Sequence, residues 1–264
     1  MKKIILSLLS IFFLFSCNEY QKAIKSEDVA VKMQVAEKMY TAGKYDKALA
    51  LFEMIAPAYK GKASAERLFY MMSQSYFKTK QYSLSGYQFE NFSVSFPKSE
   101  KVEEAAFLGA KSYSMLSPIY SLDQVDTEKA ISKVQNFIDQ YPNSTYLPQA
   151  NEIMVDMKGR IEKKVFENAK QYHTISDFKS AQVAFENFIS DFPGTPYKED
   201  ALFLKFDSAY LLAVNSVQYK MKERLETAKT AYSGLVKYKP ESKYKAKADK
   251  MIAKIDEDLK QFYK

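Results

Sequence analysis

Residues 180–194 read SAQVAFENFISDFPG, and this stretch contains the pattern that decides the fold. Ala181, Phe185 and Phe188 are spaced by four and then three residues, so they lie on one face of a helix. Pro193 cannot continue that helix, because its ring removes a hydrogen-bond donor and clashes with the preceding turn. A small residue followed by two large ones lets a second helix approach closely and fills the groove beside it. The stretch therefore predicts a helix that packs against a neighbouring helix.

The same pattern recurs at four more places along the chain. Its other copies are Ala48-Phe52-Ile55, Ser85-Phe89-Phe92-Pro97, Ala130-Val134-Phe137-Pro142 and Ala228-Tyr232-Leu235-Pro240. A second amphipathic segment precedes each copy, for example Phe69-x2-Met72-Ser73-x2-Tyr76. This arrangement resembles the tetratricopeptide repeat (TPR), a helix pair of about 34 residues. We therefore expect an all-α fold, a right-handed superhelical α-solenoid of five TPR helix pairs with a C-terminal capping helix.

The spacing between copies predicts three departures from a regular array. Residues 149–172 contain no proline and one glycine, which favours a single long helix. Residues 116–126 form an insertion that predicts an ordered surface loop, with Asp126 or Thr127 as the N-cap of the next helix. A second insertion before Ala228 lacks proline and glycine and predicts extra helix. Residues 243–264 predict the capping helix, whose inward positions would be Ala246, Ile252, Ile255 and Leu259.

The composition excludes most catalytic equipment. The 7 glycines are far apart, so neither a dinucleotide-binding loop nor a Walker A loop is possible. One His and one Cys in 264 residues rule out a multi-Cys/His zinc site and a disulfide framework. We expect His173 to serve at the surface or as a helix cap. The sequence thus predicts a protein that is not an enzyme, with no cofactor, no catalytic residue and no metal site.

The first residues have the layout of a targeting sequence. Lys2 and Lys3 precede an apolar stretch over residues 4–15, which is too short to span a bilayer. The only cysteine follows, in Leu14-Phe15-Ser16-Cys17, which resembles a bacterial lipobox with an unusually bulky Phe15. We expect a lipoprotein signal peptide over residues 1–16, lipidation at Cys17 and a lipidated linker over residues 17–28. The alternative is an ordinary cleaved signal with an incidental cysteine.

Several polar and aromatic side chains fall at positions that face the concave side of TPR arrays. They are Tyr40, Tyr70, Gln74, Phe77, Phe107 and Lys111. Exposed aromatic rings in a groove suit an extended peptide segment. The alternative is that these rings pack between adjacent helices. The basic and acidic residues, 39 against 32, are well mixed, so the charge does not predict nucleic-acid binding.

One part of the chain resembles the BamD family of outer-membrane lipoproteins. It runs from Tyr141-Pro142-Asn143-Ser144 to Asp191-Phe192-Pro193-Gly194-Thr195 and is followed by Asp200-Ala201-Leu202. The resemblance implies a scaffold of the β-barrel assembly machinery, lipid-anchored at the periplasmic face of the outer membrane. It implies that residues 29–99, repeats one and two, form a groove for nascent outer membrane β-barrel proteins. It further implies that residues 100–242, repeats three to five, dock a BamA-type barrel subunit.

Two other protein classes stay open on the sequence. A TPR lipoprotein of the Tol and cell-division system would act as a protein-protein adaptor, but such proteins typically carry an N-terminal coiled coil. Residues 18–30 are too short for one. A glycan-binding lipoprotein with TPR helices is usually far longer and uses Trp platforms, and this chain contains no Trp.

Overall fold

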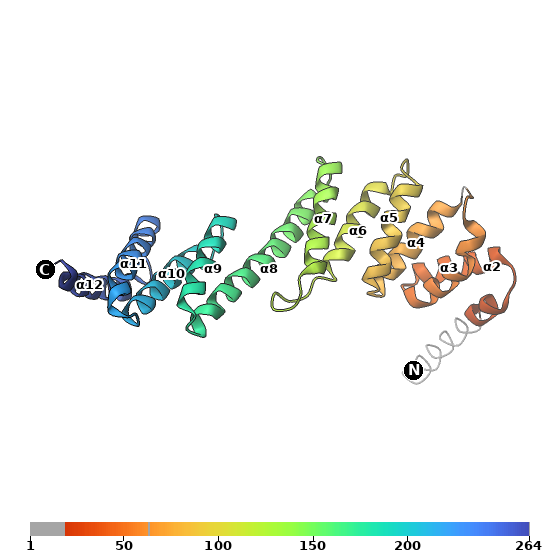
Figure 1. Ribbon diagram of the computed structural model, residues 1–264. Coiled ribbons are helices and arrows are strands. Elements are labelled where there is room, and N and C mark those ends of the chain that lie inside the picture. The colour runs from red at the N-terminus through yellow and green to blue at the C-terminus, as the bar shows by residue number, and fades with distance from the viewer. Residues whose placement is uncertain (1–18, 63, 264) are drawn as a thin grey trace, which may run out of the picture. The chain divides into compact units, whose positions relative to one another are not determined.

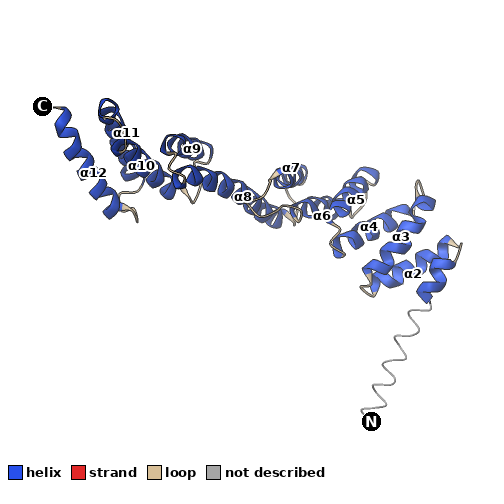
Figure 2. Ribbon diagram, turned by 60° about the horizontal axis from the view of Figure 1, so that its bottom comes forward, coloured by secondary structure: helices blue, strands red, loops and turns tan. Residues whose placement is uncertain are grey.

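The computed structural model describes residues 19–62 and 64–263, and within these residues the fold is all helical (Figures 1 and 2). Residues 19–25 are helical and lead into the first repeat. The α-helices that follow are α2 (Val29–Thr41), α3 (Tyr45–Tyr59), α4 (Ala65–Lys78), α5 (Tyr82–Ser95), α6 (Val102–Ser114), α7 (Val125–Gln140), α8 (Leu147–Thr174), α9 (Phe178–Asp191), α10 (Lys198–Val214), α11 (Gln218–Tyr238) and α12 (Lys245–Leu259). A short 3-10 helix, η1 (Lys260–Phe262), follows α12.

The chain divides into two compact units, with the boundary between Lys158 and Gly159 inside α8. In the first unit, α2 to α7 pack in chain order as antiparallel neighbours, each against the next. In the second unit, α9 to α12 follow the same rule. This arrangement confirms an α-solenoid built from TPR helix pairs. The division into functional segments 29–99 and 100–242 stays a prediction.

The repeated pattern builds the core, as the sequence predicts. Ala181, Phe185 and Phe188 are fully buried on α9, and the corresponding residues of α3, α5 and α7 are buried as well. Tyr232 on α11 is the exception: it is half-buried, and its hydroxyl donates to Asp249 of α12 over 2.8 Å. Each of the four helices that precede a repeat proline ends two residues before it, as at Asp191 before Pro193.

A turn motif that the sequence analysis missed connects the repeats. In the turns after α5, α7 and α11, a serine hydroxyl donates to a glutamate in the first turn of an earlier helix. The pairs are Ser99–Glu66, Ser144–Glu103 and Ser242–Glu199. The same hydroxyl accepts from the backbone N–H two residues later. In two of these turns that later residue is a tyrosine, and its ring stacks on a phenylalanine four residues after the glutamate. The ring centres of Tyr146 and Phe107 are 4.7 Å apart, and those of Tyr244 and Phe203 are 3.9 Å apart. Prolines therefore stop the helices, and the Ser–Glu contacts fix how the chain returns.

Glu199 shows the strength of this motif and gives a first prediction. Its carboxylate accepts from Lys239 Nζ at 2.6 Å, Ser242 Oγ at 2.8 Å and the backbone N–H of Lys243 at 2.8 Å. The hydrogen bond from Lys239 is the main cause that lowers the pKa of Glu199 from 4.5 to about 2. Because the folded pKa is lowered, this stabilisation is complete above pH 4.5 and is lost as pH falls toward 2.

We expect Glu199→Gln to lower the free energy of unfolding by roughly 1–3 kcal/mol at pH 7, because charged hydrogen bonds are lost. Chemical denaturation at pH 7 and at pH 3 measures the effect. The difference from the parent protein should shrink at pH 3. A matched control is Glu257→Gln, whose carboxylate is largely exposed and, among the described residues, pairs with Lys254 alone. An equal loss of stability in both variants would show that the hydrogen bonds of Glu199 contribute no more than an exposed ion pair.

The long helix, the loop and the extra helix appear where the sequence predicts them. Helix α8 runs unbroken over Leu147–Thr174, residues 115–124 form the loop between α6 and α7, and α10 and α11 are both lengthened. The predicted N-cap was wrong: α7 begins at Val125 with Gln124 at the cap position. The capping helix is present as α12, with Ile255 and Leu259 buried and Ile252 packed against them. Ala246 is exposed, and Ala248 takes the inward position instead.

Candidate functional site

A row of hydrogen bonds joins the predicted groove residues on the first helices of the first two repeats. The Tyr40 hydroxyl at the end of α2 donates to Gln74 Oε1 of α4 over 2.7 Å. Gln74 Nε2 donates to the Tyr70 hydroxyl over 2.6 Å. The Glu104 carboxylate of α6 lies near enough to the Tyr70 hydroxyl to raise its pKa. We call the surface formed by Tyr40, Gln74, Tyr70, Glu104 and their neighbours on α2, α4 and α6 the A-helix face.

The A-helix face is half-buried and holds neutral tyrosines. Burial, followed by the influence of the Glu104 carboxylate, raises the pKa of Tyr70 well above its ordinary value. Burial is also the main cause that raises the pKa of Tyr40. Both hydroxyls therefore keep their protons at neutral pH. Lys101 supplies positive charge beside them, because its Nζ lies 3.1 Å from Glu104 and 5.6 Å from the centre of the Tyr70 ring.

The remaining predicted groove residues have different surroundings. Phe77 is half-buried and makes an edge contact with Tyr82, with ring centres 5.6 Å apart. Lys111 is half-buried, and its Nζ lies 5.7 Å from the centre of the Phe107 ring. Phe107 itself is only 2% exposed. The expectation that Phe107 faces a groove was wrong, because the stacked Tyr146 ring covers it and makes it part of the core.

Sequence reasoning missed Glu104 and Lys101 as members of the A-helix face. Glu104 follows Glu103 in the first turn of α6, where acidic residues are common for electrostatic reasons alone. The two carboxylates nevertheless make different contacts: Glu103 accepts from Ser144, whereas Glu104 meets Tyr70. The only available signal was the helical spacing of Glu104 and Lys111, which puts both on one side of α6.

A cleft between α3, α4 and α5 is a second feature that the sequence did not indicate. Its volume is about 1140 Å³. The floor is apolar and includes Phe69, Met72, Phe92 and Phe96, and the rim carries Lys60, Lys62, Gln88, Asn91 and Val94. Residues 69, 72 and 76 of α4 face this cleft, whereas Tyr70 and Gln74 belong to the A-helix face. Helix α4 therefore presents two different surfaces, one polar and aromatic and one apolar.

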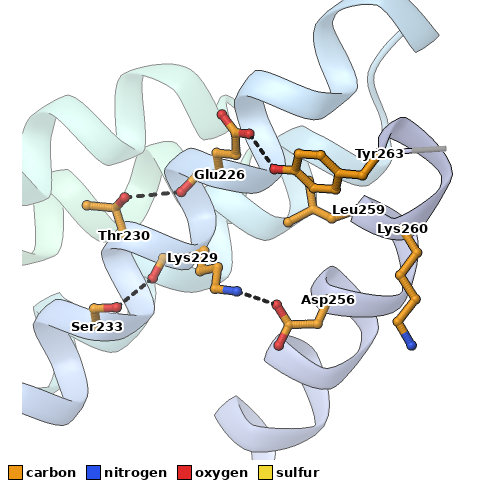
Figure 3. Close-up of a pocket in the computed structure, with 8 residues that line it drawn as sticks. All are labelled: Glu226, Lys229, Thr230, Ser233, Asp256, Leu259, Lys260 and Tyr263. Atoms are coloured by element: carbon orange, nitrogen blue, oxygen red, sulfur yellow. Dashed lines mark hydrogen bonds and ion pairs between the residues drawn. The ribbon is translucent and has the colours of Figure 1, made fainter.

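A smaller pocket of about 320 Å³ lies between α11 and the C-terminal residues (Figure 3). Two contacts within the pocket connect α11 to the C-terminal residues. Lys229 Nζ lies 2.6 Å from Asp256, and the Tyr263 hydroxyl donates to Glu226 over 2.9 Å. Because these side chains already contact one another, they hold α12 and the residues after it against α11. The pocket therefore does not resemble a ligand site.

The side chains that could carry chemistry are few. His173 near the end of α8 is not a free surface residue: its Nδ1 lies 2.9 Å from Ser208 Oγ, and its Nε2 lies 3.8 Å from Asp207. Ser208 is fully buried and donates to the Leu204 carbonyl, so it is not available as a nucleophile. Among residues 19–62 and 64–263, no group of three or more His, Cys, Asp or Glu side chains could hold a metal ion. The helices of the same residues include none with a stretch that could cross a bilayer. Cys17 lies outside the described residues.

Two comparisons with known proteins point to one family. The family model YfiO, described as outer membrane lipoprotein, matches residues 27–173 and 160–262. The outer membrane protein assembly factor BamD of Helicobacter pylori is 27% identical over 84 residues. That match covers 32% of this chain and 38% of the relative's length. A solved structure, the TPR2AB-domain:pHSP90 complex of yeast Sti1, is 13% identical in sequence. The superposition covers 86% of this chain and 98% of the Sti1 chain, with a TM-score of 0.37. The fold assignment rests on the helices described above.

Proposed function

Because the chain belongs to the YfiO family of outer membrane lipoproteins, we propose that it is a non-enzymatic scaffold that helps to assemble outer membrane proteins. The family match carries this proposal, since its two segments together span every repeat from α2 to α12. The assembly role comes from the H. pylori relative, which is named as an assembly factor. Stacked helix pairs suit such a role because they present long surfaces to other proteins.

In this proposal the protein is held at the periplasmic face of the outer membrane by lipid on Cys17. Repeats one and two, residues 29–99, receive segments of incoming β-barrel proteins. Repeats three to five, residues 100–242, dock a BamA-type barrel subunit. The charge beside the Tyr70 ring supports the first of these contacts, because Lys101, at the start of the next repeat, places its Nζ 5.6 Å from the centre of that ring.

Binding at the A-helix face would use no covalent step. The neutral hydroxyls of Tyr40 and Tyr70 and the amide of Gln74 can exchange hydrogen bonds with an extended backbone. The rings of Tyr70 and Phe77 offer apolar area, and a nearby lysine can pair with a carboxylate. An apolar segment that ends in an aromatic residue and a free carboxylate has this combination of groups. We therefore propose the C-terminal segments of β-barrel proteins as ligands.

The combined substitution Tyr70→Ala and Phe77→Ala tests the A-helix face. We expect the affinity for a synthetic peptide with the last residues of a β-barrel protein from the same cell to fall at least about tenfold, equivalent to ~1.4 kcal/mol. Fluorescence anisotropy measures binding, after melting by circular dichroism shows that the variant is folded at the assay temperature. The matched control is Tyr87→Ala, which removes an exposed tyrosine of α5 outside the A-helix face.

Unchanged affinity in the double variant would return both aromatic rings to a packing role. The apolar cleft between α3, α4 and α5 is the other surface that could hold such a segment. Val94→Lys tests it, because Val94 lies on its rim and is 81% exposed. If only Val94→Lys weakens the peptide, the binding surface is the cleft and the proposal for the A-helix face is wrong.

A further inference from the structure

The loop between α6 and α7 exposes an unusual amount of apolar surface. Met115, Ile119, Leu122 and Val125 are each between 49% and 66% exposed, although they lie within eleven residues of one another. Single exposed apolar residues are normal, but a cluster of this kind marks a contact surface. We call residues 115–125 the α6–α7 loop surface.

Hydrogen bonds from a buried glutamine fix the conformation of this loop. Gln124 is 6% exposed, and its side-chain Nε2 donates to the carbonyls of Ile119 and Leu122, each over 2.9 Å. Its Oε1 accepts from Thr127 Oγ1 over 2.8 Å, and Thr127 Oγ1 also lies 2.6 Å from Ser117 Oγ. The exposed side chains are therefore held in place before any partner arrives. Such preorganisation lowers the entropy cost of binding.

The loop and the first turn of α7 carry three acidic side chains, followed by Lys129, although the chain has a net charge of +7. Asp123, Asp126 and Glu128 are exposed and alternate with the apolar residues. None of the three takes part in the ion pairs found in the described part of the chain, and Asp123 only accepts from the Val125 N–H. An anionic lipid surface would repel three carboxylates. An apolar protein surface edged by Lys or Arg would be complementary to them.

We propose that the α6–α7 loop surface docks into a folded protein partner that offers an apolar hollow edged by Lys or Arg. Ile119 and Val125 are the apolar anchors, and Asp126 and Glu128 pair with the basic edge. The inference rests on the proposed function and deepens it, because the loop belongs to the third repeat, within the segment proposed to dock a BamA-type barrel subunit. It names the surface that makes this contact, which is separate from the A-helix face.

Photo-crosslinking in the intact, membrane-bound protein tests this contact. A benzoylphenylalanine at position 119, or separately at 125, should give an adduct with one and the same protein partner. Mass spectrometry of the adduct should place the crosslink on apolar residues that have Lys or Arg beside them. The matched control puts the same probe at Val183 of α9, which is 58% exposed. Adducts with lipid only, with a second copy of this chain only, or with equal yield at Val183 would overturn the proposal.

Charge variants separate a specific contact from chance collision. Asp126→Lys with Glu128→Lys should lower the adduct yield at position 119 at least tenfold. Asp126→Asn with Glu128→Gln should lower the adduct yield less. This second variant keeps the test valid even if the lysines disturb the start of α7. The control Asp139→Lys with Asp191→Lys changes the total charge equally at other exposed acids. Equal losses in test and control variants would contradict the pairing. Peptide binding at the A-helix face should stay unchanged in every variant, so failure here is distinct from failure of the proposed function.

Discussion

Replacing Gly109 by leucine should destabilise the first unit by about 3 kcal/mol, at the upper end of the usual cost of overpacking a core. Gly109 lies on α6 where α5 passes closest to it. A Cβ atom at this position would stand 3.2 Å from the Cβ of Phe89 and 3.7 Å from the carbonyl oxygen of Gly86. Phe89 is fully buried and α5 is packed on its other side by α4, so neither atom can move away easily.

Gly159→Leu is the matched control for this substitution. Gly159 is also inside a helix, α8, but it is exposed and a Cβ atom there would meet nothing within 4 Å. Glycine is a poor helix former, so this variant should be as stable as the parent protein or more stable by up to ~1 kcal/mol. Thermal melting by circular dichroism measures both variants. A similar loss of stability in both would contradict the close approach of α5 and α6.

Replacing Cys17 by alanine should move the protein from the membrane fraction to the soluble fraction. In the proposed function the lipid on Cys17 is the anchor, and two or more acyl chains give stable attachment where one chain alone is marginal. Membrane fractionation followed by immunoblotting measures the distribution. We expect nearly all of the parent protein in the pellet and nearly all of the variant in the supernatant.

The control for this experiment is Ser7→Ala, which changes a residue in the same leading segment and keeps the cysteine. It should fractionate like the parent protein. If the Cys17→Ala protein stays in the pellet after a carbonate wash, the anchor is not lipid on this residue. Retention that is lost after a high-salt wash would instead indicate electrostatic attachment to the membrane.

The helical fold was predictable because its signals are local. Ala181, Phe185 and Phe188 lie within two turns of one helix, and Pro193 ends it, so a short window of sequence contains the whole pattern. The Ser–Glu turn contacts were not predictable in the same way. Ser242 and Glu199 are 43 residues apart, and nothing near either residue indicates the other. The N-cap of α7 was missed because Gln124 is an unusual cap, stabilised by its own loop.

The candidate site was predicted in part. The position of a residue in a TPR repeat indicates which side of the helix its side chain lies on, but not whether a neighbouring side chain covers it. Tyr40, Tyr70 and Gln74 lie together on the A-helix face, as their positions on successive first helices suggest. Phe107 has the equivalent spacing, but a tyrosine 39 residues later stacks on it and removes it from the surface. The cleft between α3, α4 and α5 depends on how three helices pack together. The spacing of residues within a single helix does not indicate this packing.

Co-purification from the native outer membrane tests the assembly role most directly. The full-length protein, tagged at its C-terminus, is expressed at its natural level and extracted with mild detergent, with an unrelated tagged outer membrane lipoprotein as the control. Quantitative mass spectrometry then compares what each protein retains. We predict strong enrichment of a BamA-type barrel subunit with the tagged protein and none with the control. Recovery of no barrel subunit, or of a Tol-system or peptidoglycan-linked partner in its place, would contradict the assembly role.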